Sequence, residues 1–258
     1  MLQDLRYGLR MLAKSPGFTA IAVLSLALGI GANTAIFSLV NTALLKPIPV
    51  DQPDRLAAVF MTDERNPGNL PLSHLNFKDL RDQNQVFTEM AAFTFAQVNW
   101  STGTESEQTP LQVVSGNYFS VLGAQTALGR AFLPEEDLKP TPVVVLSHAY
   151  WTSRFDRSPN VIGDTLIVNG QHLTIVGVAP EGFDGTTLGA KPQVFVPITL
   201  RGLMNPGFSQ FHNRRSYWAY LFARLRPGAT IEQARTQLNV PYHAIVNDVE
   251  APLQRGMS

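Results

Sequence analysis

The hydrophobic and polar positions divide the chain into two contrasting parts. From Ser15 to Leu45 no charged residue occurs and most side chains are apolar, whereas the remainder alternates between short apolar and polar stretches. An uncharged run of this length exceeds the roughly 20 residues that a helix needs to cross a bilayer. Ser15 and Pro16 suit an N-cap and a first helical turn, and Pro47 cannot continue a helix. The pattern predicts a membrane-spanning helix over residues 15–46 whose outer end emerges into water.

Small side chains recur along this predicted helix in two rows. Ala27, Gly31 and Ala35 are spaced four residues apart, which would let a second membrane helix approach closely. Thr34, Ser38 and Thr42 form the second row, whose hydroxyls could instead bond to carbonyls of their own helix. The candidates for helix packing are therefore Ala27, Gly31, Ala35, Thr34 and Ser38.

Two other interpretations of the apolar run fail on context. Gly29-Ile30-Gly31, with Asp51 further along, imitates a dinucleotide-binding motif, but the strand that should follow would contain Pro47 and Pro49. A cleaved signal peptide has an apolar core of about 7 to 15 residues followed by a small-residue cleavage site. The run here is longer and no good site interrupts it, so we expect an uncleaved anchor.

The first 14 residues have the pattern of an amphipathic helix. Leu2, Leu5, Leu9 and Leu12 fall on one stripe, and the flank beside it carries the cations Arg6, Arg10 and Lys14. Such a helix lies in the membrane interface, and its positive charge favours a cytoplasmic N-terminus. We expect an interfacial helix over residues 1–14 on the cytoplasmic side.

The chain after Pro49 has the texture of an α+β domain, which we place at residues 50–258. Asn169-Gly170 between two β-branched stretches predicts a tight hairpin. Four helices are expected, over 73–86, 116–122, 147–155 and 230–249. The expected strands cover 55–61, 90–100, 108–114, 142–146, 165–168, 173–176, 193–198 and 217–225.

The composition excludes several classes of function. Twenty basic and twenty acidic residues leave no net charge, so the basic surface of a nucleic-acid binder is absent. The chain has no cysteine, no phosphate-binding loop and five scattered histidines without metal-ligand spacing. We therefore expect no catalytic, cofactor-binding or metal site in this chain, and an extracytoplasmic enzyme is the weakest of the functional hypotheses.

Three local clusters have simpler structural interpretations. Ser147-His148 lacks the surrounding motif of a nucleophile, and a helix cap explains the serine. The acidic run 135–137 could bind a cation, but a solvated turn or helix start is favoured. Arg214-Arg215 beside Tyr217 and Trp218 could be either a contact surface or an exposed start of a strand.

Ordered matches along nearly the whole chain resemble the MacB/FtsX-type ABC transporter permeases, and among these the duplicated-permease branch common in acidobacteria. The N-terminal matches are DLRYGLRML at 4–12, KSPGFT at 14–19 and LGIGANTAIFS at 28–38. Those that follow include VVSGNYF at 113–119, LGR at 128–130, VVVLSH at 143–148, IVGVAP at 175–180 and ARLRPG at 223–228.

The resemblance implies a MacB-like periplasmic core domain, built from a porter-like part and a smaller inserted α/β part. It also implies a separate ABC ATPase subunit, placed near Arg6 and Arg10, and other permease helices or a second permease copy in a dimeric assembly. No second apolar run follows before Ser258, so we expect the C-terminal permease part to be missing from this chain. The alternative is a single-span extracytoplasmic sensor or adaptor that uses the same domain.

The orientation can be tested with reporters in the inner membrane. Alkaline phosphatase fused after residue 100 should be active, because the basic start of the chain keeps the N-terminus in the cytoplasm. Fusion at the same position to a reporter that works only in the cytoplasm should be inactive. The opposite pair of results would reverse the topology.

Overall fold

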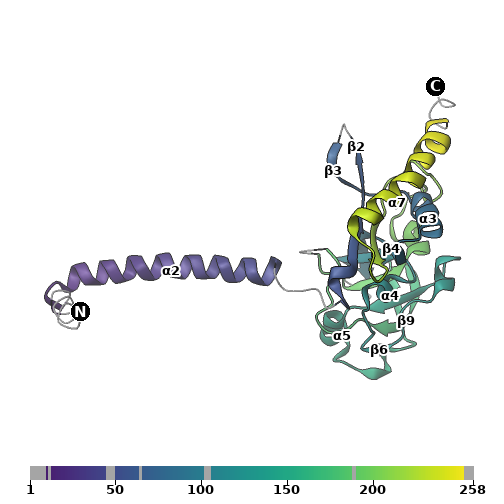
Figure 1. Cartoon of the computed structure of the whole chain (residues 1–258). Coiled ribbons are helices and arrows are strands. Elements are labelled where there is room, and N and C mark those ends of the chain that lie inside the picture. Colours follow the sequence, from purple (N-terminus) through teal and green to yellow (C-terminus); the bar gives the residue numbers. More distant parts are fainter. Residues whose placement is uncertain are drawn as a thin grey trace. The chain divides into compact units, whose positions relative to one another are not determined.

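The computed structural model describes residues 10, 13–44, 50–63, 66–101, 106–187 and 190–252. The chain divides into two compact units, Met1–Pro47 and Ile48–Ser258. The first contains the helix α2, Pro16–Leu44, which confirms the helix predicted for the apolar run (Figure 1). In the described part of the chain, α2 is the one helix long and apolar enough to cross a membrane, over Pro16–Ser38.

Nine described strands of the second unit form one mixed sheet in the order β1-β11-β4-β5-β10-β7-β9-β6, and β8 pairs with β4 and β9. Two neighbouring pairs, β10 with β5 and β7 with β9, are parallel. A separate two-stranded sheet joins β2, Met61–Asp63, to β3, Asn66–Leu70. The strands of the large sheet are β1 (Leu56–Val59), β4 (Phe87–Ser101), β5 (Ser106–Val114), β6 (Leu128–Gly129), β7 (Val143–Leu146), β8 (Thr165–Val168), β9 (Gln171–Val178), β10 (Val194–Pro197) and β11 (Tyr220–Leu225).

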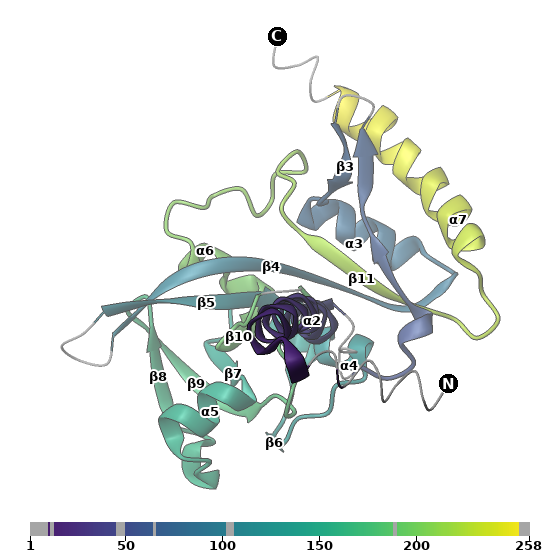
Figure 2. The same cartoon turned by 90° about the vertical axis from the view of Figure 1, so that its left-hand side faces the viewer.

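Figure 2 shows α3 and α7 beside the β11 end of the sheet and α5 near β8 and β9. The α-helices of this unit are α3 (His74–Gln83), α4 (Tyr118–Leu122), α5 (His148–Phe155), α6 (Arg201–Met204) and α7 (Ile231–Ala244). Short 3-10 turns occur at η1 (Pro53–Arg55), η2 (Pro134–Asp137), η3 (Pro159–Val161) and η4 (Ile198–Leu200), and a π-helical turn, η5 (Ile245–Glu250), follows α7. The α+β prediction is therefore confirmed.

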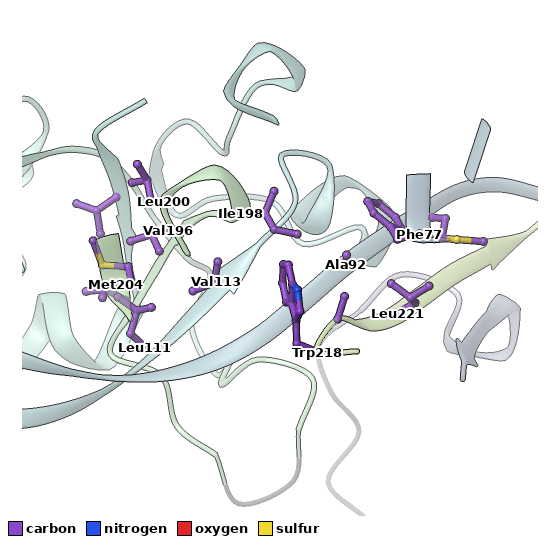
Figure 3. Close-up of a cluster of buried hydrophobic side chains, with 14 of the residues drawn as sticks. Phe77, Ala92, Leu111, Val113, Val196, Ile198, Leu200, Met204, Trp218 and Leu221 are labelled. Carbon is purple, nitrogen blue, oxygen red and sulfur yellow. The ribbon is translucent and has the colours of Figure 1, made fainter. Parts of the chain in front are cut away.

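Side-chain alternation along β4 builds a hydrophobic core on each face of the sheet. Met90 and Ala92 belong to the larger core, which includes Phe77 of α3. Ala91 and Phe93 belong to the second core, which includes Tyr118 of α4. Figure 3 shows part of the larger core, in which side chains from β4, β5, β10 and β11 gather with Trp218. Strand β4 thus contributes to both hydrophobic cores and joins them across the sheet.

Several elements that the sequence predicts from local signals are confirmed. The backbone φ is 48° at Asn169 and 75° at Gly170, as a two-residue hairpin turn with both residues left-handed requires. The Ser73 side chain accepts a hydrogen bond from the Asn76 amide at the start of α3, and Ser147 caps α5 in the same way. Gly123, with φ 68°, ends α4.

Several predicted boundaries were wrong, and four of them have a local cause or a clear shift. The strand expected from residue 55 starts at Leu56, because Pro53 begins a 3-10 turn, and it separates into β1 and β2. The helix expected to reach residue 86 stops at Gln83, where Asn84 turns the chain and accepts a hydrogen bond from the Phe87 amide. Strand β11 begins three residues later than expected, and the last helix changes to a π turn at residue 245.

Candidate functional site

The chain enters the domain at a point fixed by backbone hydrogen bonds. The Asp51 amide donates to the Leu122 carbonyl at 3.0 Å, at the end of α4. Arg224 of β11 donates from Nη2 to the Asp51 carbonyl at 2.7 Å and from Nε to the Val121 carbonyl at 2.8 Å. One guanidinium therefore holds the incoming chain against both α4 and the sheet. We name Asp51, Val121, Leu122 and Arg224 the inlet anchor.

Close packing adds to this attachment. Gly123 has a positive φ of 68°, and a Cβ there would lie 2.4 Å from the Cβ of Asp51. Nearby, Arg55 donates from Nε and Nη2 to the Leu225 carbonyl at 3.0 and 2.6 Å. The first residues of the domain are consequently bonded to Arg224 and Leu225, the last two residues of β11.

A buried carboxylate holds the C-terminal helix to the rest of the domain. Glu250 is 8% exposed and accepts hydrogen bonds from Asn76 Nδ2 at 2.8 Å and from the Tyr217 hydroxyl at 2.7 Å. Arg214 donates from Nη1 to Asn76 Oδ1 at 2.8 Å and forms an ion pair with Asp79 at 2.6 Å. These five side chains link η5, α3 and the segment before β11, and we name them the outlet clamp.

The π turn explains why Glu250 faces inward. Ala234 and Ile245 lie on the buried side of the C-terminal helix, and α-helical spacing from Ile245 would next bury residues 248 and 249. Pro241 lies inside α7 and removes one backbone donor, and η5 follows four residues later. The wider turn rotates the later residues, so Val249 is 39% exposed while Glu250 is buried.

The cluster around Arg214 was not resolved by sequence reasoning. Trp218 is buried and Arg214 is paired inward, whereas Arg215 and Tyr217 are exposed, so neither interpretation describes the whole cluster. Burial, followed by the hydrogen bond to Glu250, raises the pKa of Tyr217. One signal in the sequence could have pointed to the clamp: a carboxylate in the last turn of a helix opposes the helix dipole unless it has partners.

The acidic run 135–137 is only partly the solvated turn that the sequence predicts. Glu135 is exposed, but Glu136 is buried and pairs with Arg130 at 2.8 Å. Asp137 is half-buried and accepts a hydrogen bond from the Gly116 amide at 2.7 Å. Burial is the main cause that raises the Asp137 pKa to about 6. The run therefore ties η2 to the loop before α4.

The residues proposed for helix packing all lie on α2. Ala27, Gly31, Ala35, Thr34 and Ser38 are exposed within the described part of the chain. A Cβ added at Gly31 would meet no other atom within 4 Å. Arg10 is also exposed, and Arg6 lies outside the described residues. Packing and ATPase contact both remain predictions.

The catalytic and metal candidates gain no support from the geometry. Ser147 Oγ accepts from the Tyr150 amide at 3.1 Å, which confirms the helix cap, and the His148 ring lies edge-on to Trp151. Among the described residues, no group of three or more His, Asp or Glu side chains could hold a metal ion.

Replacing Tyr217 by Phe should weaken the outlet clamp. The variant deprives the buried Glu250 carboxylate of one donor, so the free energy of unfolding should fall by about 1 to 3 kcal/mol. Urea denaturation of the full chain in detergent measures this change. Tyr220→Phe is the control, since Tyr220 is similarly exposed, at 44% against 37% for Tyr217, but is not one of the donors to Glu250. Equal losses in the two variants would contradict a specific role for the Tyr217 hydroxyl.

Replacing Asp137 by Asn should change how stability depends on pH. The Asp137 pKa rises from 3.8 to about 6 on folding, so the folded state binds more protons between these values and loses stability as pH increases. Asn keeps an oxygen acceptor for the Gly116 amide but does not titrate. As the pH rises from 4 to 7, the free energy of unfolding of Asp137→Asn should therefore increase relative to that of the unmodified chain, by on the order of 1 to 3 kcal/mol.

Thermal unfolding across this pH range gives the comparison, and Asp164→Asn at an exposed position is the control. Parallel pH profiles for the Asp137 variant and the unmodified chain would show that burial of this carboxyl has no effect on stability.

The comparisons with known proteins agree with this architecture. The family model for the MacB-like periplasmic core domain matches residues 19–240. The periplasmic region of MacB from Actinobacillus actinomycetemcomitans is similar with a TM-score of 0.56 and 17% identity, over 71% of this chain and 80% of that one. The extracellular domain of the noncanonic ABC-type transporter YknZ from Gram-positive bacteria gives 0.52 and 14%, over 70% and 88%. No curated protein sequence matches. Because the family match covers most of its length, the chain belongs to the family of MacB-like periplasmic core domains.

Proposed function

We propose that this chain is the membrane-anchored periplasmic part of an ABC transporter permease subunit, and that it transmits motion of α2 to the extracytoplasmic side without catalysing a reaction. The observation that carries this proposal is the extent of the family match, which begins inside α2 at residue 19 and continues through the domain to residue 240. The family model thus includes most of α2 together with the core domain.

The length of α2 supports transmission of force. Its 29 residues span about 44 Å at 1.5 Å per residue, whereas the hydrocarbon core is about 30 Å thick. The excess would place the helical turns near Ser38 in water on the outer side. Pro47 and Pro49, with restricted φ, make a stiffer connection to the domain than a glycine-rich linker would.

The inlet anchor and the outlet clamp support a rigid route through the domain. A displacement at Asp51 acts on β11 through Arg224, which lies in that strand. Tyr217 of the outlet clamp precedes β11 by three residues, so the same strand leads to the C-terminal helix. The hydrogen bonds at each end involve backbone carbonyls or a buried carboxylate, and both are costly to break.

The remaining parts of the proposal concern partners and orientation. The N-terminus is cytoplasmic in the inner membrane, and Arg6 and Arg10 lie near a separate ABC ATPase subunit. The face of Ala27, Gly31 and Ala35 packs against another permease helix or a second copy. This chain acts without a cofactor of its own.

Inserting a flexible Gly-Ser segment between Leu45 and Pro47 tests the transmission of motion. In the assembled transporter the insertion should leave ATP hydrolysis largely unchanged, because the cytoplasmic side is intact. The extracytoplasmic output should be lost, since a flexible linker absorbs the displacement of α2. ATP hydrolysis and output are measured on the same reconstituted preparation.

The matched control places the same segment between Lys139 and Pro140, which are both exposed. That insertion should preserve both activities. If output also survives the first insertion, α2 is only an anchor, and a single-span sensor or adaptor becomes the better assignment.

A further inference from the structure

A buried guanidinium lies in an aromatic corner at the start of α6. Arg201 is 7% exposed, and its Cζ lies 4.1 Å from the ring centroids of both Phe208 and Trp218. The two rings are 5.5 Å apart and nearly perpendicular, at 84°. These distances place the rings on adjacent sides of the guanidinium and not on opposite faces. The rings stabilise the cation through their π electrons, but they accept no conventional hydrogen bonds.

The polar atoms of this corner lack partners within the described part of the chain. Arg201 Nε and Nη1 are buried without a hydrogen bond, and so are Trp218 Nε1 and His74 Nδ1. Burial lowers the pKa of Arg201 to about 10 and that of His74 to about 4, so at neutral pH the first is charged and the second is neutral. Proteins ordinarily pair a buried charge or bond it fully.

Two other partly buried arginines of this domain follow that rule. Arg214 pairs with Asp79 at 2.6 Å, and Arg130 pairs with Glu136 at 2.8 Å. The shift in the Arg201 pKa has desolvation as its cause, with no neighbouring carboxylate contributing to it. Arg201 is therefore a cation whose counter-charge is not supplied by the described residues.

The segment over residues 205–217 covers this corner. Phe208 and Phe211 are partly buried and pack against the larger core, and the Phe211 ring lies 4.2 Å from that of His74 and 5.9 Å from that of Trp218. Most other residues of the segment are exposed. Phe208 and Phe211 thus hold the first part of this largely solvated segment over the buried donors, while Arg214 and Tyr217 near its end belong to the outlet clamp.

We propose that the corner at Arg201 binds a small organic carboxylate, and that the segment 205–217 covers the bound molecule. A carboxylate supplies the missing negative charge and matches the planar donors of a guanidinium. The surrounding aromatic rings favour a ligand with a short apolar body over a fully hydrated inorganic ion. The loop moves to admit the ligand, because Nε and Nη1 are closed to solvent in the structure.

The experiment titrates the full chain in detergent with sodium butyrate, sodium phosphate or sodium chloride at equal ionic strength. Nuclear magnetic resonance follows the indole N–H of Trp218, assigned with Trp218→Phe. Butyrate should give a saturable shift, and Arg201→Met should weaken the apparent affinity at least tenfold. Arg235→Met, at an exposed position of α7, should bind butyrate as the unmodified chain does.

The Nε–H resonance of Arg201 in the unmodified chain provides a second readout that needs no folded variant. It should shift with butyrate at the same concentrations as the Trp218 resonance. A saturable response to phosphate alone would overturn the choice of a carboxylate. If neither resonance responds to butyrate beyond the chloride control, buried water satisfies these donors and the site does not exist.

Discussion

The first residues of the periplasmic core domain are held by hydrogen bonds from Arg224 to backbone carbonyls. These acceptors are the carbonyls of Asp51 and Val121, which belong to the incoming chain and to the last turn of α4. A cation at the C-terminal end of a helix is favoured by the helix dipole, so the guanidinium is well placed on α4 even without the incoming chain. Because the guanidinium binds main-chain atoms, these contacts do not depend on the side chains of Asp51 and Val121.

The C-terminal helix is held by chemistry of a different kind. Glu250 is a desolvated carboxylate, and its neutral donors are Asn76 Nδ2 and the Tyr217 hydroxyl. Loss of either donor leaves a buried charge less well satisfied, which weakens the remaining contacts. The clamp is therefore expected to open as a unit.

Sequence reasoning succeeded where a signal is local. The apolar run predicted α2, Asn169-Gly170 predicted the hairpin, and serines at helix starts predicted the caps of α3 and α5. Each of these depends on residues that are neighbours in the chain. Most bonds of the inlet anchor and the outlet clamp join residues more than 100 positions apart. The π turn that buries Glu250 also departs from the 3.6-residue helical period that sequence patterns assume.

Sequence reasoning also failed to predict which charged side chains are buried, and one of these, Arg201, points to a ligand. The acidic run 135–137 looks like a solvated turn because its burial comes from distant neighbours, including Thr199, whose hydroxyl donates to the Glu136 carbonyl. Once the fold is known, Glu136 and Arg214 have partners of opposite charge and Glu250 has two donors. Arg201 has aromatic rings alone. The fold supplies partners to these other buried charges, so it offers no structural reason for an unpaired Arg201. The proposed ligand would supply the missing negative charge and so provide that reason.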